Sequence, residues 1–213
     1  MANILLGATG SVAAVRVPML VERFRAQGHE VRVVATKAAT YFFDPIPLRE
    51  ILTLDSDEWP GERYQRGDAV QHIELRRWAD LFAIAPLDAN TLAKLAVGLS
   101  DNCLTCVWRA WDPAKPIVLA PAMNTLMWEH AFTKKHLRAI GADFGAGHVP
   151  GHLNDEDLIR QINDRAKGLR IVAPISKALA CGDVGVGAMA EVPTVVSVAT
   201  DLFAVGSEMR KTV

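Results

Sequence analysis

Short apolar runs alternate with segments of helical periodicity along the first part of the chain. Residues 3–8 form an apolar run that stops at Thr9-Gly10-Ser11, and residues 12–27 carry apolar side chains at helical spacing. Gly28 suits the left-handed position after a helix, and residues 30–35 then form a β-branched run. This order predicts a strand, a tight loop, a helix and a second strand, which is a βαβ unit.

The same alternation recurs twice further along the chain. Residues 81–85 predict a strand, followed by a polar loop and a helix over residues 91–97 that ends at Gly98. Residues 116–120 predict another strand, followed by a turn and a helix over about residues 125–140. Because strands that are apolar on both faces and separated by helices are typical of covered parallel sheets, we expect one α/β domain, Rossmann-like or flavodoxin-like, with a doubly wound parallel sheet. Its ligand would bind where loops leave the carboxyl ends of the strands.

Three other segments do not fit this alternation. Residues 55–71 are polar, contain glycine and proline, and predict a mobile loop. Residues 141–168 are glycine-rich and then charged, which predicts a solvated helix capped by Asn154, in a surface element or a lid. Residues 178–191 surround Cys181 with glycine and alanine and predict a flexible flap over the site.

Composition narrows the class of protein. The chain has 213 residues, half of them hydrophobic, and a formal net charge of −1, so we expect one compact domain and no nucleic-acid partner. The first residues lack a basic n-region and no apolar stretch approaches bilayer length, so we expect neither a secretory signal nor a membrane partner. Three cysteines without a secretory context favour a reducing, cytoplasmic location and no disulfide framework.

Two of the cysteines form a C-x-x-C pair, Cys103-Leu104-Thr105-Cys106. A zinc site would need two more ligands nearby, and the sequence contains no second pair. A redox role is disfavoured because the stretch has the pattern of a helix interior. We therefore expect these thiols to pack in the structure and expect no metal site.

The loop that follows the first strand, residues 7–12, places backbone N–H groups and a hydroxyl at a helix N-terminus, where an anion such as a phosphate can bind. Its spacing departs from G-x-G-x-x-G, since Ala13 occupies the place of the third glycine. Thr36-Lys37 follows the second strand, where a dinucleotide enzyme has an acidic residue. The loop favours a mononucleotide over NAD, and a simple connecting turn remains the alternative.

Four separated motifs carry a resemblance to a known family. They are His72-Ile-Glu-Leu-Arg-Arg-Trp-Ala-Asp80, Pro86-Leu-Asp-Ala-Asn-Thr91, Pro121-Ala-Met-Asn-Thr-Leu-Met-Trp128, and the segment from Cys181 to Glu191. In this order they resemble the homo-oligomeric flavin-containing cysteine decarboxylases. The resemblance covers most of residues 3–141 and resumes over about 169–203, so residues 141–168 are expected to be an insertion that is atypical of the family.

The resemblance implies the cofactor and the residues that hold it. The cofactor would be FMN, bound by Gly10, Ser11, Val12, Thr36, Lys37, Asp88, Ala89, Asn90, Thr91 and Ala122. Asp88 and Asn90 stand at the start of a predicted helix, where free N–H groups and an amide can reach a flavin edge. For Asp88 an ordinary helix cap is the stronger alternative.

The resemblance also implies roles for four residues. His72 matches the family's catalytic histidine, and imidazole suits proton transfer at neutral pH. Asn124 matches the residue that holds the substrate carboxylate at a helix N-terminus, and Met123 beside it is also expected to bind the substrate. Cys181 matches a proton-donating cysteine on a flap. A structural histidine and a helix-capping asparagine are the alternatives for His72 and Asn124.

The implied activity is FMN-dependent decarboxylation of a small-molecule, cysteine-derived carboxylate. An oxidised flavin would first take a hydride equivalent from the thiol-bearing carbon to give a thioaldehyde, and the electron pair left on carbon when carbon dioxide departs can then delocalise onto sulfur. The family resemblance further implies a homotrimer with sites between subunits. Two other functions stay open: a regulatory protein that binds a phosphatase, for which the long extra tails of such relatives are missing here, and a decarboxylase of peptide C-terminal cysteine.

Overall fold

The computed structural model describes residues 1–59, 61–63, 65–178 and 184–211, and its centre is a parallel sheet. The six strands lie in the order β3-β2-β1-β4-β5-β6, all parallel. Their bounds are β1 Asn3–Ala8, β2 Glu30–Ala35, β3 Leu52–Leu54, β4 Leu81–Leu87, β5 Ile117–Pro121 and β6 Leu169–Ile171. Every residue of β4 and β5 is buried, as expected of central strands covered on both faces.

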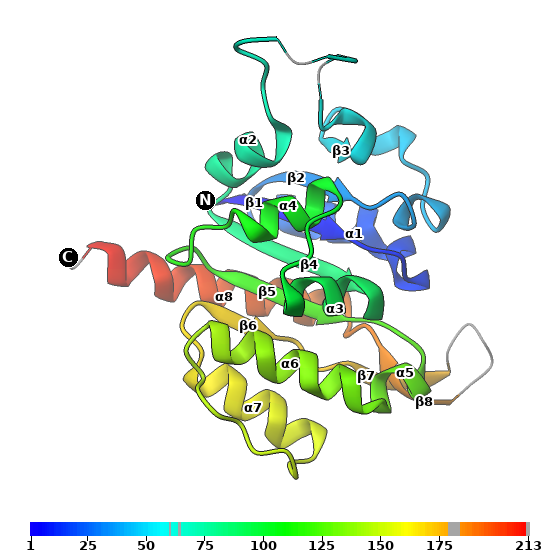
Figure 1. Cartoon of the computed structure of the whole chain (residues 1–213), viewed down its shortest axis with the longest axis vertical. Helices are drawn as coiled ribbons and strands as arrows, with labels where there is room; N and C mark the ends of the chain where they lie inside the picture. The colour runs from blue at the N-terminus through cyan, green and yellow to red at the C-terminus, as the bar shows by residue number, and fades with distance from the viewer. Residues whose placement is uncertain (60, 64, 179–183, 212–213) are drawn as a thin grey trace.

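Helices cover both faces of this sheet (Figure 1). On one face, α1 (Val17–Ala26) and α8 (Val192–Lys211) pack with the sheet into one hydrophobic cluster. The second cluster, on the other face, contains α2 (Gln71–Trp78), α3 (Ala89–Val97), α4 (Cys103–Arg109), α6 (Ala131–Asp143) and α7 (Asp155–Arg165). The predicted doubly wound α/β domain is confirmed, and its strand order is that of a Rossmann sheet.

Short elements complete the chain. Four 3₁₀ turns are η1 Val12–Arg16, η2 Ala39–Tyr41, η3 Ile46–Leu48 and η4 Asp55–Asp57, and one short helix is α5 Thr125–Glu129. Strands β7 (Ile175–Ala178) and β8 (Val184–Ala188) pair antiparallel outside the main sheet. Cys181 lies outside the described residues, so the structure says nothing of its side chain.

Two helices differ from the sequence prediction. The helix expected over residues 12–27 begins as the 3₁₀ turn η1 and becomes α-helical only at Val17, because Pro18 lacks an N–H and fits only the first turn of a helix. The helix expected over residues 125–140 is two helices that meet at His130. His130 has an extended backbone, and its ring nitrogen accepts a hydrogen bond from Phe132 N–H at 3.2 Å, which caps α6.

The charged segment after residue 141 contributes to the core. Asn154 caps α7 as predicted, since its Oδ1 accepts a hydrogen bond from Asp157 N–H at 2.8 Å. The charged side of α7 faces solvent, as predicted, whereas Leu158 and Ile162 on its other side are buried in the second cluster. A Cβ on Gly141 of α6 would lie 3.0 Å from Ile162, so α6 and α7 approach closely. That this segment is an insertion relative to the family remains a prediction.

The C-x-x-C pair packs in α4, as expected. Cys103 is buried, Cys106 is partly buried, and both are free thiols. Burial raises the pKa of Cys103 well above its ordinary value, and the neighbouring Glu58 carboxylate raises it further. Across the described part of the chain no group of side chains could hold a metal ion, and no helix is both long and apolar enough to cross a membrane.

Candidate active site

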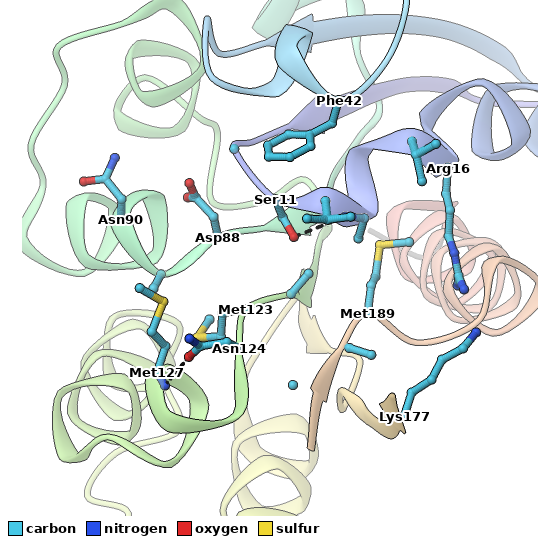
Figure 2. Close-up of a pocket in the computed structure, with 18 residues that line it drawn as sticks. Ser11, Arg16, Phe42, Asp88, Asn90, Met123, Asn124, Met127, Lys177 and Met189 are labelled. Carbon is cyan, nitrogen blue, oxygen red and sulfur yellow. Dashed lines mark hydrogen bonds between the residues drawn. The ribbon is translucent and has the colours of Figure 1, made fainter. Parts of the chain in front are cut away.

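A cavity of about 480 Å³ opens at the carboxyl ends of β1, β4 and β5 (Figure 2). It lies beside the boundary between β1 and β4, where the chain reverses its direction of winding and where open α/β sheets bind ligands. The loops that follow these three strands line the cavity, and β8 borders one side of it. The lining comprises Gly10 to Ala13, Val15, Arg16, Phe42, Asp88 to Asn90, Ala122 to Asn124, Met127, Lys177 and Gly187 to Met189.

The loop after β1 approaches its neighbours so closely that position 10 must be glycine. A Cβ there would lie 2.7 Å from the Cβ of Ala38 and 3.1 Å from Oδ2 of Asp88. Ser11 then starts η1, and its hydroxyl accepts a hydrogen bond from Ala13 N–H at 3.3 Å. Glycine at this position therefore lets the loop after β1 pack against Ala38 and Asp88, and Gly10 itself lines the cavity.

Thr9 joins the ends of β1 and β4. Its fully buried hydroxyl donates to Pro86 O at 2.9 Å and accepts from Asp88 N–H at 2.7 Å. Asp88 in turn caps α3, since its Oδ1 accepts from Thr91 N–H at 2.7 Å. The helix-cap alternative for Asp88 is therefore correct, and the same residue still lines the cavity.

The loop after β5 brings Ala122, Met123 and Asn124 to the opposite wall. Ala122 N–H donates to Leu87 O at 2.8 Å, which holds this loop against the end of β4. Asn124 caps α5, because its Oδ1 accepts from Met127 N–H at 2.8 Å. The Nδ2 group, a hydrogen-bond donor, is the part of the Asn124 amide that the cap does not use.

Strand β8 is fastened to this loop by its backbone. Met123 N–H donates to Gly187 O at 2.9 Å. Gly187 has a φ of 148°, and a Cβ there would lie 2.4 Å from Met123 O. The close approach requires glycine at this position and places Met189 beside the cavity.

Two cations stand at the rim of the cavity. Arg16 pairs with Glu191 at 3.0 Å, and Lys177 lies 3.6 Å from the same carboxylate. Two positive charges share one negative partner, so this edge can attract an anionic group. Arg16, Lys177 and the aromatic Phe42 were missed by sequence reasoning, because they come from three segments that only the tertiary structure brings together (Figure 2).

Three residues expected to bind the cofactor do not line the cavity. Thr36 is buried, and its hydroxyl accepts from Ala39 N–H at 3.3 Å at the start of the turn that carries Phe42. Lys37 is exposed beside it, and Thr91 is buried in α3. The cavity brings together Gly10, Ser11, Val12, Asp88, Ala89, Asn90, Ala122, Met123 and Asn124 from the expected set.

His72 also lies away from the cavity within one chain. It belongs to the first turn of α2, next to the segment that follows β3, whereas α5 and β8 border the cavity in another part of the molecule (Figure 1). Its Nδ1 contacts Oε1 of Glu58. No histidine lines the cavity among the described residues, so a single chain does not supply His72 to it.

The cavity fits a planar cofactor with an anionic tail. Val12, Phe42 and Met123 supply apolar walls, and the loop from Gly10 to Val12 lies at the start of η1, where main-chain N–H groups can bind an anion. The volume of the cavity and its place at the carboxyl end of the sheet suit a mononucleotide. The fold and the site together define an α/β protein that binds a mononucleotide cofactor.

Comparison with known proteins agrees with this class. The chain belongs to the Flavoprotein family, whose model matches residues 1–204. Phosphopantothenoylcysteine decarboxylase of Oryza sativa subsp. japonica is 48% identical over 196 residues, which cover 91% of this chain and 77% of the relative. The Mus musculus protein of the same name is 46% identical, over 92% of this chain and 84% of the relative.

Solved structures agree as well. A cysteine-to-serine mutant of PPC decarboxylase complexed with pantothenoylaminoethenethiol superposes with a TM-score of 0.77 and 43% identity, over 95% of this chain and 98% of the other. The FMN binding protein AtHal3 superposes with a TM-score of 0.72 and 45% identity, over 95% of this chain and 96% of the other.

Proposed function

We propose that this protein catalyses the FMN-dependent decarboxylation of (R)-4′-phospho-N-pantothenoylcysteine to 4′-phosphopantetheine in coenzyme A biosynthesis. The observation that carries the proposal is the single cavity that joins Gly10-Ser11-Val12, Asp88-Ala89-Asn90 and Met123-Asn124 at the ends of three strands. Relatives at 46–48% identity bear the name of this decarboxylase. Such similarity over nearly the whole chain makes the same chemistry the best-supported activity.

The residues of the cavity would hold FMN as follows. The loop from Gly10 to Val12 and the rim cation Arg16 suit its phosphate, and Asp88, Ala89 and Asn90 offer polar contacts to its ring edge or ribityl chain. Ala122 supplies a small side chain against which a flat ring can lie. Bound FMN supplies a two-electron acceptor that allows a thiol-bearing carbon to be oxidised before carbon dioxide leaves.

The chain's own groups bind the substrate and move protons. The Nδ2 group of Asn124 donates to the substrate carboxylate, and Met123 and Met127 exclude water around the reacting carbons. His72 accepts a proton from the substrate thiol. Cys181, which lies outside the described residues, donates a proton when the enethiol left by decarboxylation is reduced to the saturated product.

This mechanism requires more than one copy of the chain at each site. We propose a homotrimer in which His72 of one subunit reaches the cavity of its neighbour, because His72 does not line the cavity of its own chain. Exposed apolar side chains in and beside the cavity would be covered by such a neighbour; they are Val12, Val15, Leu126, Met127 and Phe132. The free thiols Cys103 and Cys106 are compatible with a cytoplasmic, reducing location.

The proposed activity is tested on the purified full-length chain. The protein should be yellow, should release FMN on denaturation, and should form carbon dioxide from phosphopantothenoylcysteine. His72→Asn should abolish carbon dioxide release while FMN stays bound, and Cys181→Ser should stop formation of saturated 4′-phosphopantetheine. Bound FMN without any turnover would contradict the proposed activity and favour a phosphatase-regulatory role. Turnover of a peptide that ends in cysteine, with none of phosphopantothenoylcysteine, would contradict the proposed substrate.

The oligomer is tested by mixing two inactive variants. His72→Asn and Asn124→Ala subunits, unfolded together and reassembled, should regain part of the activity, because some interfaces then combine an intact His72 with an intact Asn124. A monomer in sedimentation that retains full activity would contradict the shared site.

A further inference from the structure

Glu58 is a buried carboxylate that lies outside the cavity. It follows η4 in the segment between β3 and α2, and 6% of its surface is exposed. Its Oε1 contacts Nδ1 of His72, whose side chain is 19% exposed. Segments 14 residues apart in the sequence thus meet through one carboxylate and one imidazole.

The placement of this carboxylate is costly for folding. Its second oxygen, Oε2, is buried without a hydrogen-bond partner. Burying a carboxylate oxygen without a partner is unfavourable, so an apolar or amide side chain of similar size would suit stability at least as well. Local features that oppose stability are concentrated at functional sites, which points to a role beyond packing.

Among the ionisable groups near Glu58, His72 is the one whose nitrogen contacts the carboxylate. The other ionisable groups are Asp55 in η4 and Cys103 and Cys106 in α4. Asp55 accepts a hydrogen bond from Cys103 N–H at 3.0 Å and is engaged there. Burial, and then the Glu58 carboxylate itself, raise the pKa of Cys103, so its thiol stays neutral. Among the described residues, two side chains reach Glu58: the neutral Cys103 thiol, which can only donate weakly to it, and the His72 imidazole, whose Nδ1 contacts Oε1.

A carboxylate that accepts a hydrogen bond from one imidazole nitrogen determines whether the other nitrogen carries a proton or a lone pair. An ionised carboxylate can only accept, so it holds the proton of a neutral imidazole on Nδ1. The lone pair then resides on Nε2, the nitrogen that remains available to a substrate. When Nε2 accepts a proton, the carboxylate stabilises the resulting imidazolium.

We propose that Glu58 is a positioning residue for His72: it fixes the Nδ1–H tautomer and the ring orientation, so that Nε2 can accept a proton from the substrate thiol. This inference rests on the proposed function, which assigns His72 to the reaction. Helix α2, which carries His72, packs against α4, which carries Cys103, in one hydrophobic cluster. This packing holds His72 in place beside the carboxylate. Glu58 was not identified by sequence reasoning, because it lies in a polar segment that predicts only a loop.

The test combines a spectroscopic measurement with kinetics. In the FMN-bound full-length protein, nitrogen-15 NMR of the imidazoles, with the His72 signal identified by its loss in His72→Asn, should show the proton on Nδ1. Glu58→Gln should move the proton to Nε2, because a side-chain amide can donate to Nδ1. The same variant should lower kcat by about 10-fold or more and leave KM within about twofold.

Two further variants separate positioning from folding. Asp57→Asn removes a neighbouring carboxylate that pairs with Arg49 at 2.8 Å and does not touch His72, so it should keep both the tautomer and kcat. Glu58→Asp keeps the charge and should retain the Nδ1–H form and recover part of kcat. A Glu58→Gln protein with unchanged tautomer and wild-type kcat would overturn the proposal, as would wild-type His72 protonated on Nε2 alone. If His72→Asn itself turned over normally, the proposed role of His72 would fail instead.

Discussion

The hydroxyl of Thr9 lies between two strands that are 77 residues apart in sequence, accepting from Asp88 N–H at 2.7 Å and donating to Pro86 O at 2.9 Å. One side chain thereby sets the distance between the loop after β1 and the loop after β4. Those loops form facing parts of the cavity lining, so the shape of the cavity depends on a residue that does not itself line it.

Replacing Thr9 by valine should therefore weaken both folding and cofactor binding. The change keeps the volume but leaves buried polar groups without partners, which should lower the free energy of unfolding by about 2 kcal/mol. Urea denaturation of the apoprotein measures this. Thr40→Val is the matched control, because its hydroxyl donates to Lys37 O at an exposed position, and it should cost about 0.5 kcal/mol or less. Equal losses in the two variants would contradict the linking role of Thr9.

Gly10→Ala should reduce FMN affinity by about 10-fold or more, because the new methyl group would lie 2.7 Å from the Cβ of Ala38 and displace the loop. Quenching of flavin fluorescence on titration measures the affinity. The double variant Gly10→Ala/Ala38→Gly removes the clash and should regain part of the loss. Gly151→Ala is the control, since nothing lies within 4 Å of its Cβ position, and its affinity should match the wild type.

Gly187→Ala should lower kcat/KM by about 10-fold or more, because a Cβ at 2.4 Å from Met123 O would push β8 away from the loop that carries Asn124. Steady-state kinetics with saturating FMN measure the effect. Val186→Ala changes the adjacent residue, which is 36% exposed, and should leave kinetics nearly unchanged. A Gly187→Ala enzyme with wild-type kcat/KM would show that β8 does not position the Met123–Asn124 turn.

Asp155 should stabilise the fold more as a hydrogen-bond acceptor than through its negative charge. It accepts from Trp128 Nε1 at 2.6 Å and pairs with Lys134 at 2.6 Å, and Lys134 lies 3.6 Å from the Trp128 ring centroid. Asp155→Ala should lower the free energy of unfolding by about 1–2 kcal/mol, whereas Asp155→Asn, which keeps an acceptor, should cost about 0.5 kcal/mol. Chemical unfolding followed by Trp fluorescence measures both. A larger loss in Asp155→Asn than in Asp155→Ala would contradict this ranking.

His29 should make the protein less stable in acid. Burial lowers the pKa of His29 in the folded state, and the positive N-terminus lowers it further; its Nδ1 accepts a hydrogen bond from Ala2 N–H at 3.2 Å. The unfolded chain therefore binds the proton more readily, and the stability that neutral His29 contributes is lost as pH falls from about 6.5 through the lower folded pKa. His29→Gln keeps an acceptor without titrating, so its free energy of unfolding should fall less over this range. Identical pH dependence of the two proteins in urea denaturation would contradict the prediction.

The alternation of apolar runs and helical periods was sufficient to predict the doubly wound sheet. Strands β4 and β5 are apolar throughout, and such short apolar runs that reach a proline at 86 or 121 leave few alternatives. The loops after β1, β4 and β5 were also predictable as a site, because parallel strands place their carboxyl ends at one edge. The capping roles of Asp88, Asn124 and Asn154 followed from residue type and position at helix starts.

Other features depended on contacts between distant segments, which periodicity does not encode. Arg16, Phe42 and Lys177 meet at the cavity although no local pattern relates them, and Glu58 reaches His72 only because the segment after β3 packs beside α2. The break at His130 follows from a local cap that overrides a continuous helical pattern. By itself the sequence determined the order of elements and the loops that bear the chemistry, because local propensity and burial pattern act over a few residues. Tertiary packing alone decided which side chains face each other across the cavity and which lie outside it.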